Sequence, residues 1–135
     1  MSTTEVRGDF DVKVQPQAPS DPAQAAGVGR MSLDKQFHGP LEGPSRGEML
    51  ALMTEVQGSG VYVAIERFTG TLEGRAGSFA LHHTGIMERG APILTVTVVP
   101  DSGTGELAGI SGRMRIVIAG GKHSYEFEYG LGAPG

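Results

Sequence analysis

The segment TGTLEGRAGSFAL at residues 69–81 has a second copy, TGELAGISGRMRI, at residues 104–116. Both copies follow the pattern T-G-x-L-x-G-x-x-G-x-apolar-x-apolar. In each copy a short strand reaches glycines that permit a tight bend, and apolar and polar residues then alternate again. Solenoids and propellers need at least about three repeats to bury a continuous core. Two copies therefore predict duplicated hairpins within one closed sheet.

Alternating or β-branched segments occupy much of the remaining chain. The segment 122–129 alternates most clearly, with aromatic residues on one face and charged residues on the other. Further strands are predicted at 10–15, 29–38, 48–56, 61–68, 78–83, 92–99 and 113–118. Glycine and proline predict a turn at 43–47 and a Pro-rich loop at 16–25, where 21–26 would fit one turn of helix.

About eight strands with almost no helix favour closure of the sheet, because closure removes exposed strand edges. We therefore predict one all-β domain over residues 1–135, folded as a small closed antiparallel β-barrel. A β-sandwich is the alternative. A barrel of about eight strands is either filled by its own side chains or holds one small ligand.

Composition excludes several classes of function. The net charge is −4 and no run of Lys or Arg forms a basic stripe, so nucleic acid is not expected as a partner. Cysteine is absent, which excludes disulfides, thiolate nucleophiles and zinc–cysteine sites. The first residues lack the apolar core of a signal peptide, and no apolar run approaches about 20 residues. We therefore expect a cytoplasmic protein without a membrane partner.

Four motifs carry a resemblance to a known family: IERFTG at 65–70, GSFALHH at 77–83, SGTGELAGISG at 102–112 and HSYEFEYGL at 123–131. Over roughly residues 41–131, the chain resembles a bacterial family of uncharacterised proteins, domain of unknown function 3224. The resemblance implies a fold similar to the small barrels of allene oxide cyclase and dirigent proteins, which bind apolar molecules without a cofactor. It implies no activity, because one fold serves many functions.

Glu66, His83 and His123 are the candidate catalytic residues. His82 and His83 are adjacent on a strand and point to opposite faces, and His83 shares its parity with apolar neighbours. Either Glu66 or Arg67 should face inward, because the rest of 61–68 is apolar apart from these two. A buried carboxylate beside a histidine would serve as an acid, a base or an electrostatic stabiliser. The alternative is a structural ion pair that plugs the barrel.

Ligand-binding candidates form an apolar wall with a few polar tips: Arg67, Phe79, Tyr125, Phe127 and Tyr129. The aromatic residues among them would equally fill the core. No metal or other cofactor is predicted, because the H-x-H pair that cupin-type metalloenzymes place on one strand is missing.

Two hypotheses follow. In the first, the barrel binds a small apolar molecule and works as a cofactor-free isomerase or cyclase, through orientation and electrostatic preorganisation. In the second, a packed, non-catalytic barrel forms a homo-oligomer through its outer face, because strands 61–68 and 92–99 carry apolar residues on both faces. An empty interior would distinguish the first from the second.

Overall fold

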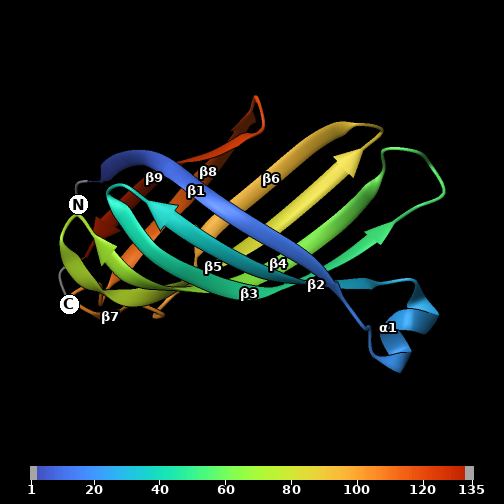
Figure 1. Cartoon of the computed structure of the whole chain (residues 1–135), viewed down its shortest axis with the longest axis horizontal. Coiled ribbons are helices and arrows are strands. Elements are labelled where there is room, and N and C mark those ends of the chain that lie inside the picture. The colour runs from blue at the N-terminus through green and yellow to red at the C-terminus, as the bar shows by residue number, and fades with distance from the viewer. Residues whose placement is uncertain (1–2, 133–135) are drawn as a thin grey trace.

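The computed structural model describes residues 3–132, which form a closed antiparallel β-barrel (Figure 1). Eight strands close the ring in the order β1–β2–β3–β4–β5–β6–β8–β9, and β9 pairs with β1. The ring strands are β1 (Thr4–Gln17), β2 (Gly29–His38), β3 (Leu41–Met53), β4 (Gly60–Leu72), β5 (Arg75–Glu88), β6 (Ala91–Val98), β8 (Ile110–Ala119) and β9 (Lys122–Leu131). The predicted closed barrel is confirmed.

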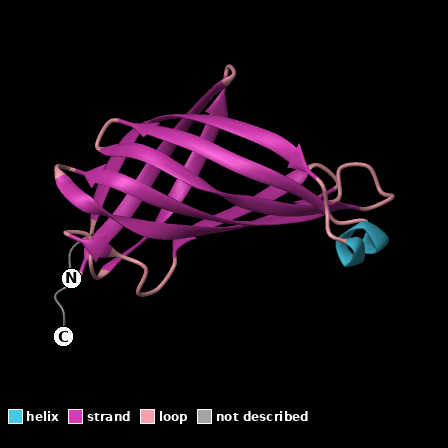
Figure 2. Cartoon of the chain, turned by 60° about the horizontal axis from the view of Figure 1, so that its bottom comes forward, coloured by secondary structure: helices cyan, strands magenta, loops and turns pink. Residues whose placement is uncertain are grey.

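A helix of six residues, α1 (Asp21–Ala26), is the single helix in the described part of the chain. Ser20 caps it by accepting a hydrogen bond from the Ala23 N–H. Figure 2 shows α1 at the end of the barrel opposite the two termini. No helix within residues 3–132 is long and apolar enough to span a membrane. The predicted Pro-rich loop is shorter than expected, because β1 continues through Pro16, which pairs with Met31.

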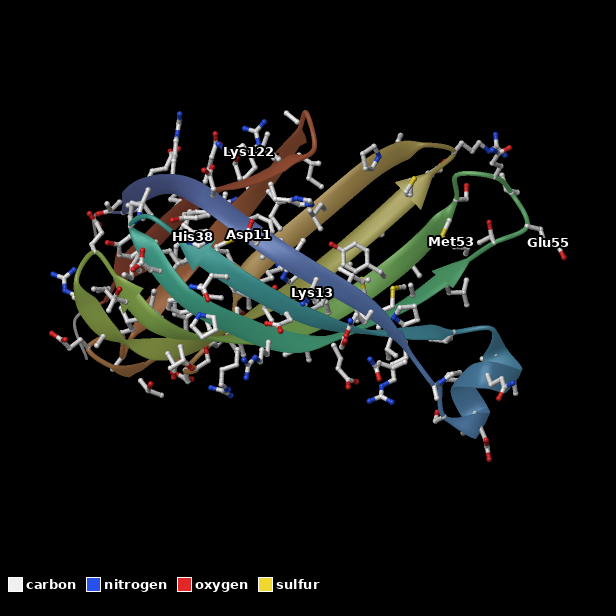
Figure 3. All side chains as sticks on the ribbon, viewed as in Figure 1. Asp11, Lys13, His38, Met53, Glu55 and Lys122 are labelled. Carbon is white, nitrogen blue, oxygen red and sulfur yellow. The ribbon has the colours of Figure 1, made fainter. Side chains whose placement is uncertain are left out.

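The two ends of the barrel carry different connections. The closed end carries the β2–β3 turn, the β4–β5 turn and the connection from β6 to β8, which includes β7 (Thr104–Gly105). The open end carries α1, the β3–β4 connection, the β5–β6 turn and the β8–β9 turn. Figure 3 places Met53 and Glu55 at the β3–β4 connection of the open end.

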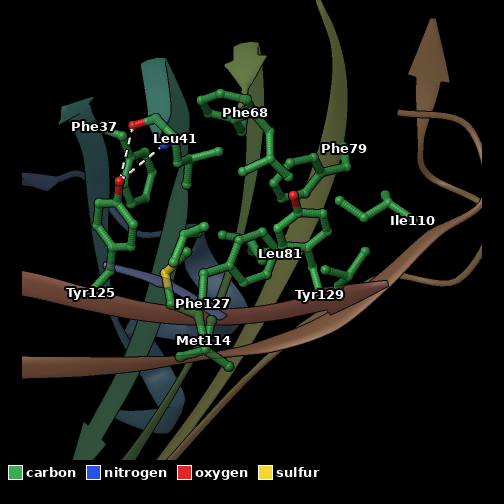
Figure 4. Packing of buried hydrophobic residues seen from close by; sticks show 14 of the residues in the cluster. Phe37, Leu41, Phe68, Phe79, Leu81, Ile110, Met114, Tyr125, Phe127 and Tyr129 are labelled. Carbon is green, nitrogen blue, oxygen red and sulfur yellow. Dashed lines mark hydrogen bonds between the residues drawn. The ribbon is translucent and has the colours of Figure 1, made fainter. Parts of the chain in front are cut away.

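Aromatic side chains fill the half of the interior next to the closed end (Figure 4). Phe37, Phe68 and Phe79 have no exposed surface, and consecutive ring centroids in this series lie 5.9 and 5.1 Å apart. The Tyr125 hydroxyl donates to the His38 carbonyl at 2.9 Å and accepts from the Leu41 N–H at 3.1 Å. This half therefore has a packed core in which the buried hydroxyl is paired.

The two copies of the repeat share a local conformation but pair differently. Gly74 and Gly109 are equivalent positions and both have φ near 82°, a left-handed conformation that glycine adopts without a steric penalty. The first copy forms the β4–β5 hairpin. In the second, β7 pairs with β5 of the first copy, whereas β8 pairs with β6 and β9. The prediction of two hairpins is wrong for the second copy.

Residues 43–47, predicted as a turn, lie inside β3. The turn prediction is wrong, because Gly43 and Gly47 let β3 pack closely against β4 and do not reverse the chain. A Cβ at Gly47 would overlap the carbonyl oxygen of Ile65 on β4. The absence of a side chain therefore lets the two strands approach closely, and β3 begins at Leu41, seven positions before the predicted start at 48.

The ring has one weak seam, between β6 and β8. The two strands are paired only at Val96–Met114 and Thr97–Arg113. Beyond these pairs the β8–β9 hairpin diverges from β6 toward the open end, as Figure 1 shows. Two residue pairs therefore close the ring at this seam, and the barrel opens beyond them toward the open end.

Candidate functional site

Four polar side chains are buried together inside the barrel. Lys35, Ser45, Glu66 and His83 lie on the neighbouring strands β2, β3, β4 and β5, and each is at most 5% exposed. Lys35 Nζ donates to Glu66 Oε2 at 2.7 Å, and His83 Nε2 lies 2.5 Å from the same oxygen. Ser45 Oγ donates to Glu66 Oε1 at 2.7 Å. Glu66 is thus the centre of a four-residue cluster.

The strand register brings these four side chains together. Lys35 pairs with Ser45, Glu66 pairs with Gly47, and His83 pairs with Ala64. Each of the four occupies an inward position of an alternating strand. The two small partners leave room for the Glu66 carboxylate and the His83 ring inside the barrel.

Electrostatics keep Glu66 ionised. Burial by itself raises the pKa of this carboxyl, but the hydrogen bond from His83 and the charge of Lys35 outweigh burial and lower the pKa to about 2. An ionised carboxylate only accepts hydrogen bonds, so His83 Nε2 carries the shared proton. In neutral His83 the lone pair then belongs to Nδ1. Lys35 Nζ also lies 5.2 Å from the centre of the Phe10 ring, a cation–π contact.

An apolar cavity of about 340 Å³ lies at the open end. Met49, Tyr62 and Leu94 line it from inward positions of β3, β4 and β6. Gly85 lies under the Tyr62 ring, which a Cβ at this position would overlap. Burial and the charge of Glu66 raise the pKa of the Tyr62 hydroxyl, so this group stays protonated at neutral pH. The remaining lining is Ala51, Met53, Gly60, Val61, Ile86, Met87, Pro92, Ile93 and Ile118.

On β5, the lining of the cavity begins one inward position beyond the polar cluster. Gly85, which lines the cavity, is the next inward residue of β5 after His83. On the other side of His83, Leu81 is fully buried, and the flanking Ala64 and Val96 are each 2% exposed. Gly85, under the Tyr62 ring, is therefore the inward position of β5 between His83 and the open end.

The structure separates the predicted catalytic residues. Glu66 and His83 are in contact, whereas His123 is on β9, where its ring packs against Phe10 with centroids 5.3 Å apart. Lys35 Nζ contacts the same Phe10 ring. His123 is thus a neighbour of the cluster through Phe10 and makes no hydrogen bond to it in the described residues.

The predicted ligand-binding residues lie away from the cavity. Arg67 points to the outside and is exposed. The four aromatic candidates are buried in the packed half: Phe79, Tyr125, Phe127 and Tyr129. Within the described residues, no group of three or more His, Cys, Asp or Glu side chains is arranged to hold a metal ion.

Sequence reasoning missed Lys35, Ser45 and Tyr62. The sequence indicated an inward position for Lys35, because Lys35 lies on the same face of the predicted strand 29–38 as Leu33 and Phe37. An inward lysine requires a buried anion as its partner. Ser45 could not be found in this way, because its segment was interpreted as a turn.

Comparisons with known proteins place the chain in a family. The sequence profile of DUF3224, described as a protein family of unknown function, matches residues 6–129. The chain belongs to the DUF3224 family. The structure of this DUF3224 chain is similar to the crystal structure of a family member of unknown function from Shewanella oneidensis MR-1, with 50% sequence identity and a TM-score of 0.91. The similarity covers 98% of this chain and 100% of that one.

The resemblance to DUF3224 is therefore confirmed. A comparison with curated proteins found no match. The expected likeness to allene oxide cyclase stays a prediction, because the family and the solved structure carry no function.

Proposed function

We propose that this DUF3224 barrel binds a small, mostly apolar molecule in the cavity at its open end. The observation that supports this proposal is an apolar cavity whose lining residue Gly85 is one inward position from His83 of the buried Lys35–Glu66–His83 cluster. Ligand pockets typically combine an apolar lining with a few fixed polar groups. A solidly packed interior is not favoured, because only the closed half is filled by side chains.

The cluster also supports proton transfer without a cofactor. Glu66 holds the Nε2–H of His83, which leaves Nδ1 as the proton acceptor whenever the ring is neutral. Lys35 offsets the charge of Glu66, so the buried group carries no net charge while His83 is neutral. A cofactor-free isomerase requires such a base beside a bound apolar substrate. Substrate recovered from D₂O should then contain deuterium with the native protein and none with the His83→Phe variant.

Native mass spectrometry of the protein from its own source tests binding directly. We expect an extra mass of a few hundred daltons that disappears on denaturation. The variant Ala51→Phe fills the cavity and should lose this mass. Ala25→Phe adds the same side chain on the exposed surface of α1 and should keep it. Retention of the mass by Ala51→Phe would place the ligand elsewhere and contradict the proposal.

We also propose that the outer face of β3 to β6 binds a second copy of this chain. Six apolar side chains at outward positions there are 40–67% exposed: Leu50, Val61, Val63, Ile65, Ile86 and Ile93. Val61, Ile86 and Ile93 also border the open-end cavity. Leu50 pairs with Val63, and Ile86 pairs with both Val61 and Ile93, so the patch is contiguous across strands. Apolar side chains of this kind can pack against the same side chains of a second copy, as a two-fold interface requires. The exposed Arg30–Glu48 ion pair borders the patch.

Light scattering coupled to gel filtration tests the interface. We expect an oligomer for the native chain and a monomer for Val63→Lys, because a buried lysine without a partner is costly. Thr71→Lys places the same charge on the exposed outer face of β4 near the closed end and should leave the oligomer intact. A monomeric native chain would refute this interface while leaving the ligand proposal in place.

A further inference from the structure

We infer that β8 pairs edge to edge with β8 of a second copy of this chain, antiparallel and with the two copies of Val117 opposite each other. This contact differs from the one on the outer face of β3 to β6, and it requires no ligand. The inference starts from the weak seam, where β6 and β8 share only two residue pairs. Beyond these pairs, within the described residues, 115–119 pair with β9 alone and 91–95 pair with β5 alone.

The β8–β9 turn determines which backbone groups of β8 point toward the seam. Ala119 pairs with Lys122 across a two-residue loop at 120–121, and both loop glycines have positive φ. The pair that flanks such a loop exchanges both backbone hydrogen bonds, and along the hairpin these pairs alternate with pairs that exchange none. Counted back from Ala119, every second residue therefore bonds to β9. The residues between them, Ile118 and Ile116, direct their N–H and C=O groups toward the seam.

These groups form an unprotected strand edge. Ile116 and Ile118 have no strand partner on the seam side within residues 3–132. The β5–β6 turn has the same two-residue form, so Pro92 and Leu94 of β6 point toward the seam by the same alternation. Pro92 has no N–H to offer, which is a common protection of a strand edge. The free part of β8 contains no proline and keeps all of its donors and acceptors.

A two-fold register centred on Val117 uses every free group of this edge. Ile116 of each copy then lies opposite Ile118 of the other, and each such pair exchanges both of its N–H···O=C bonds. Centring the register on Ile116 would instead place Ile118 opposite Met114, which already pairs with Val96. Centring it on Ile118 would place Ile116 opposite the β8–β9 turn. The hydrogen-bonding pattern of the edge is therefore complementary to itself in one register.

The side chains are compatible with this register. Ile118 is 65% exposed and would pack against Ile116 of the second copy. Val117 lies opposite itself in a pair without backbone hydrogen bonds, where side chains come closest. Arg115 lies opposite Ala119, so no like charges face each other. Figure 1 shows the β8–β9 hairpin diverging from β6, which leaves this edge accessible.

The contact is small, and its size sets the conditions of the test. A few residues from each copy bury far less than the about 800 Å² per partner of a stable interface. Pairing through β8 is therefore weak and forms at high protein concentration, whereas dilute gel filtration reports the interface of β3 to β6. The Val63→Lys variant removes that other interface and serves as the background for both experiments below.

A single cysteine traps the register directly, because the chain has no cysteine of its own. Opposite residues in a pair without hydrogen bonds have Cα atoms about 4.5 Å apart, which is within the range of a disulfide. Val117→Cys should therefore form a disulfide-linked dimer about tenfold faster than Ser111→Cys on non-reducing gels. Ser111 is exposed on the same face of β8, away from the free edge. Equal rates for the two variants would overturn the inference.

Amide hydrogen exchange measures the same contact without a covalent trap. Exchange at Ile116 and Ile118 should slow as the protein concentration rises. Val117→Lys and Val117→Glu should each abolish this slowing, because like charges then face each other across the two-fold axis. An equimolar mixture of the two variants should restore it, and the control Ser111→Lys should retain it.

The exchange results also test the inference apart from the two proposals above. Exchange at Ile116 and Ile118 that does not depend on concentration would overturn the pairing of β8. A mixture of the two charge variants that fails to restore the slowing would overturn the register centred on Val117. Either result leaves the open-end cavity and the outer face of β3 to β6 unaffected, because the variants lie outside both.

Discussion

The closed and open halves of this barrel are built from the same eight strands but differ in what fills them. Next to the closed end, rings such as Phe37, Phe68 and Phe79 leave no exposed surface. At the open end, Met49 and Leu94 line a cavity and remain partly exposed. The polar cluster around Glu66 lies where the two halves meet. The packed closed half supplies stability. This stability keeps the buried Lys35–Glu66 ion pair in place near the cavity of the open half.

The largest expected change in the free energy of unfolding comes from a comparison of packing in the two halves. Phe68→Ala should reduce the free energy of unfolding by about 3–5 kcal/mol, because it leaves a hole in the packed core. Met49→Ala should cost about 1 kcal/mol, because this side chain already borders open space. Urea unfolding of both variants measures the difference. Equal losses would show that the two halves are packed alike.

Substitution of Glu66, where the two halves meet, should give the next largest loss of stability. Glu66→Gln leaves Lys35 buried without its anion and should cost about 3 kcal/mol at pH 7. The pKa of Glu66 is about 2 in the fold, below its ordinary 4.5, so the ionised form stabilises the fold above about pH 4.5. This stabilisation is lost as the pH falls toward 2. The stability gap between the native protein and Glu66→Gln should therefore narrow in acid.

Glu48→Gln is the matched control for that measurement. Glu48 forms an exposed ion pair with Arg30, at 2.6 Å, and such pairs contribute little. Its substitution should change the stability little, and the gap to the native protein should show no comparable collapse between pH 4.5 and 2. A constant gap for Glu66→Gln over this pH range would show that Glu66 does not carry the buried charge.

A smaller effect is expected where β3 and β4 approach each other at the junction. Gly47→Ala should cost about 2 kcal/mol, because its Cβ would overlap the backbone of β4 and the strands would have to move apart. Gly29→Ala is the control, because its nearest contact would be an ordinary 3.8 Å. Thermal unfolding compares the two variants. A tolerated Gly47→Ala would show that the junction is less tightly packed than this contact implies.

The smallest expected effect compares one tyrosine from each half. The Tyr129 hydroxyl donates to Glu73 at the closed end, and burial together with this carboxylate raises the pKa of Tyr129 to about 12. Tyr129→Phe should therefore cost about 1 kcal/mol. Tyr62→Phe should leave the stability unchanged, because the Tyr62 hydroxyl has no hydrogen-bond partner within residues 3–132. Chemical denaturation of the two variants measures both values, and a comparable loss in Tyr62→Phe would reveal a partner for this hydroxyl.

Much of the fold could be predicted because alternation along a strand is a local property. The aromatic face of 122–129 and the strand at 29–38 were readable for this reason. The turn predicted at 43–47 shows the limit of local reasoning, since glycine indicates a turn and a close strand contact equally well. Which of the two applies at Gly47 depends on Ile65, a residue on another strand.

The candidate site was partly readable for the same reason. Parity along the strand places His83 rather than His82 inside, and the structure agrees. Parity also placed Tyr125 and Phe127 on an inner face, but it could not tell a packed core from a cavity wall. That distinction depends on side chains from all eight strands together.

The sequence by itself determined an all-β fold with one aromatic face inside, and it favoured a closed barrel over a β-sandwich, because strand periodicity and turn residues act over neighbouring positions. The tertiary structure alone decided that Glu66, and not Arg67, turns inward. It also decided that Lys35 and His83 meet Glu66, and that the open end stays unfilled. The contacts of Glu66 depend on strand register, and the open end depends on the weak β6–β8 seam. Both are set by residues far apart in the chain.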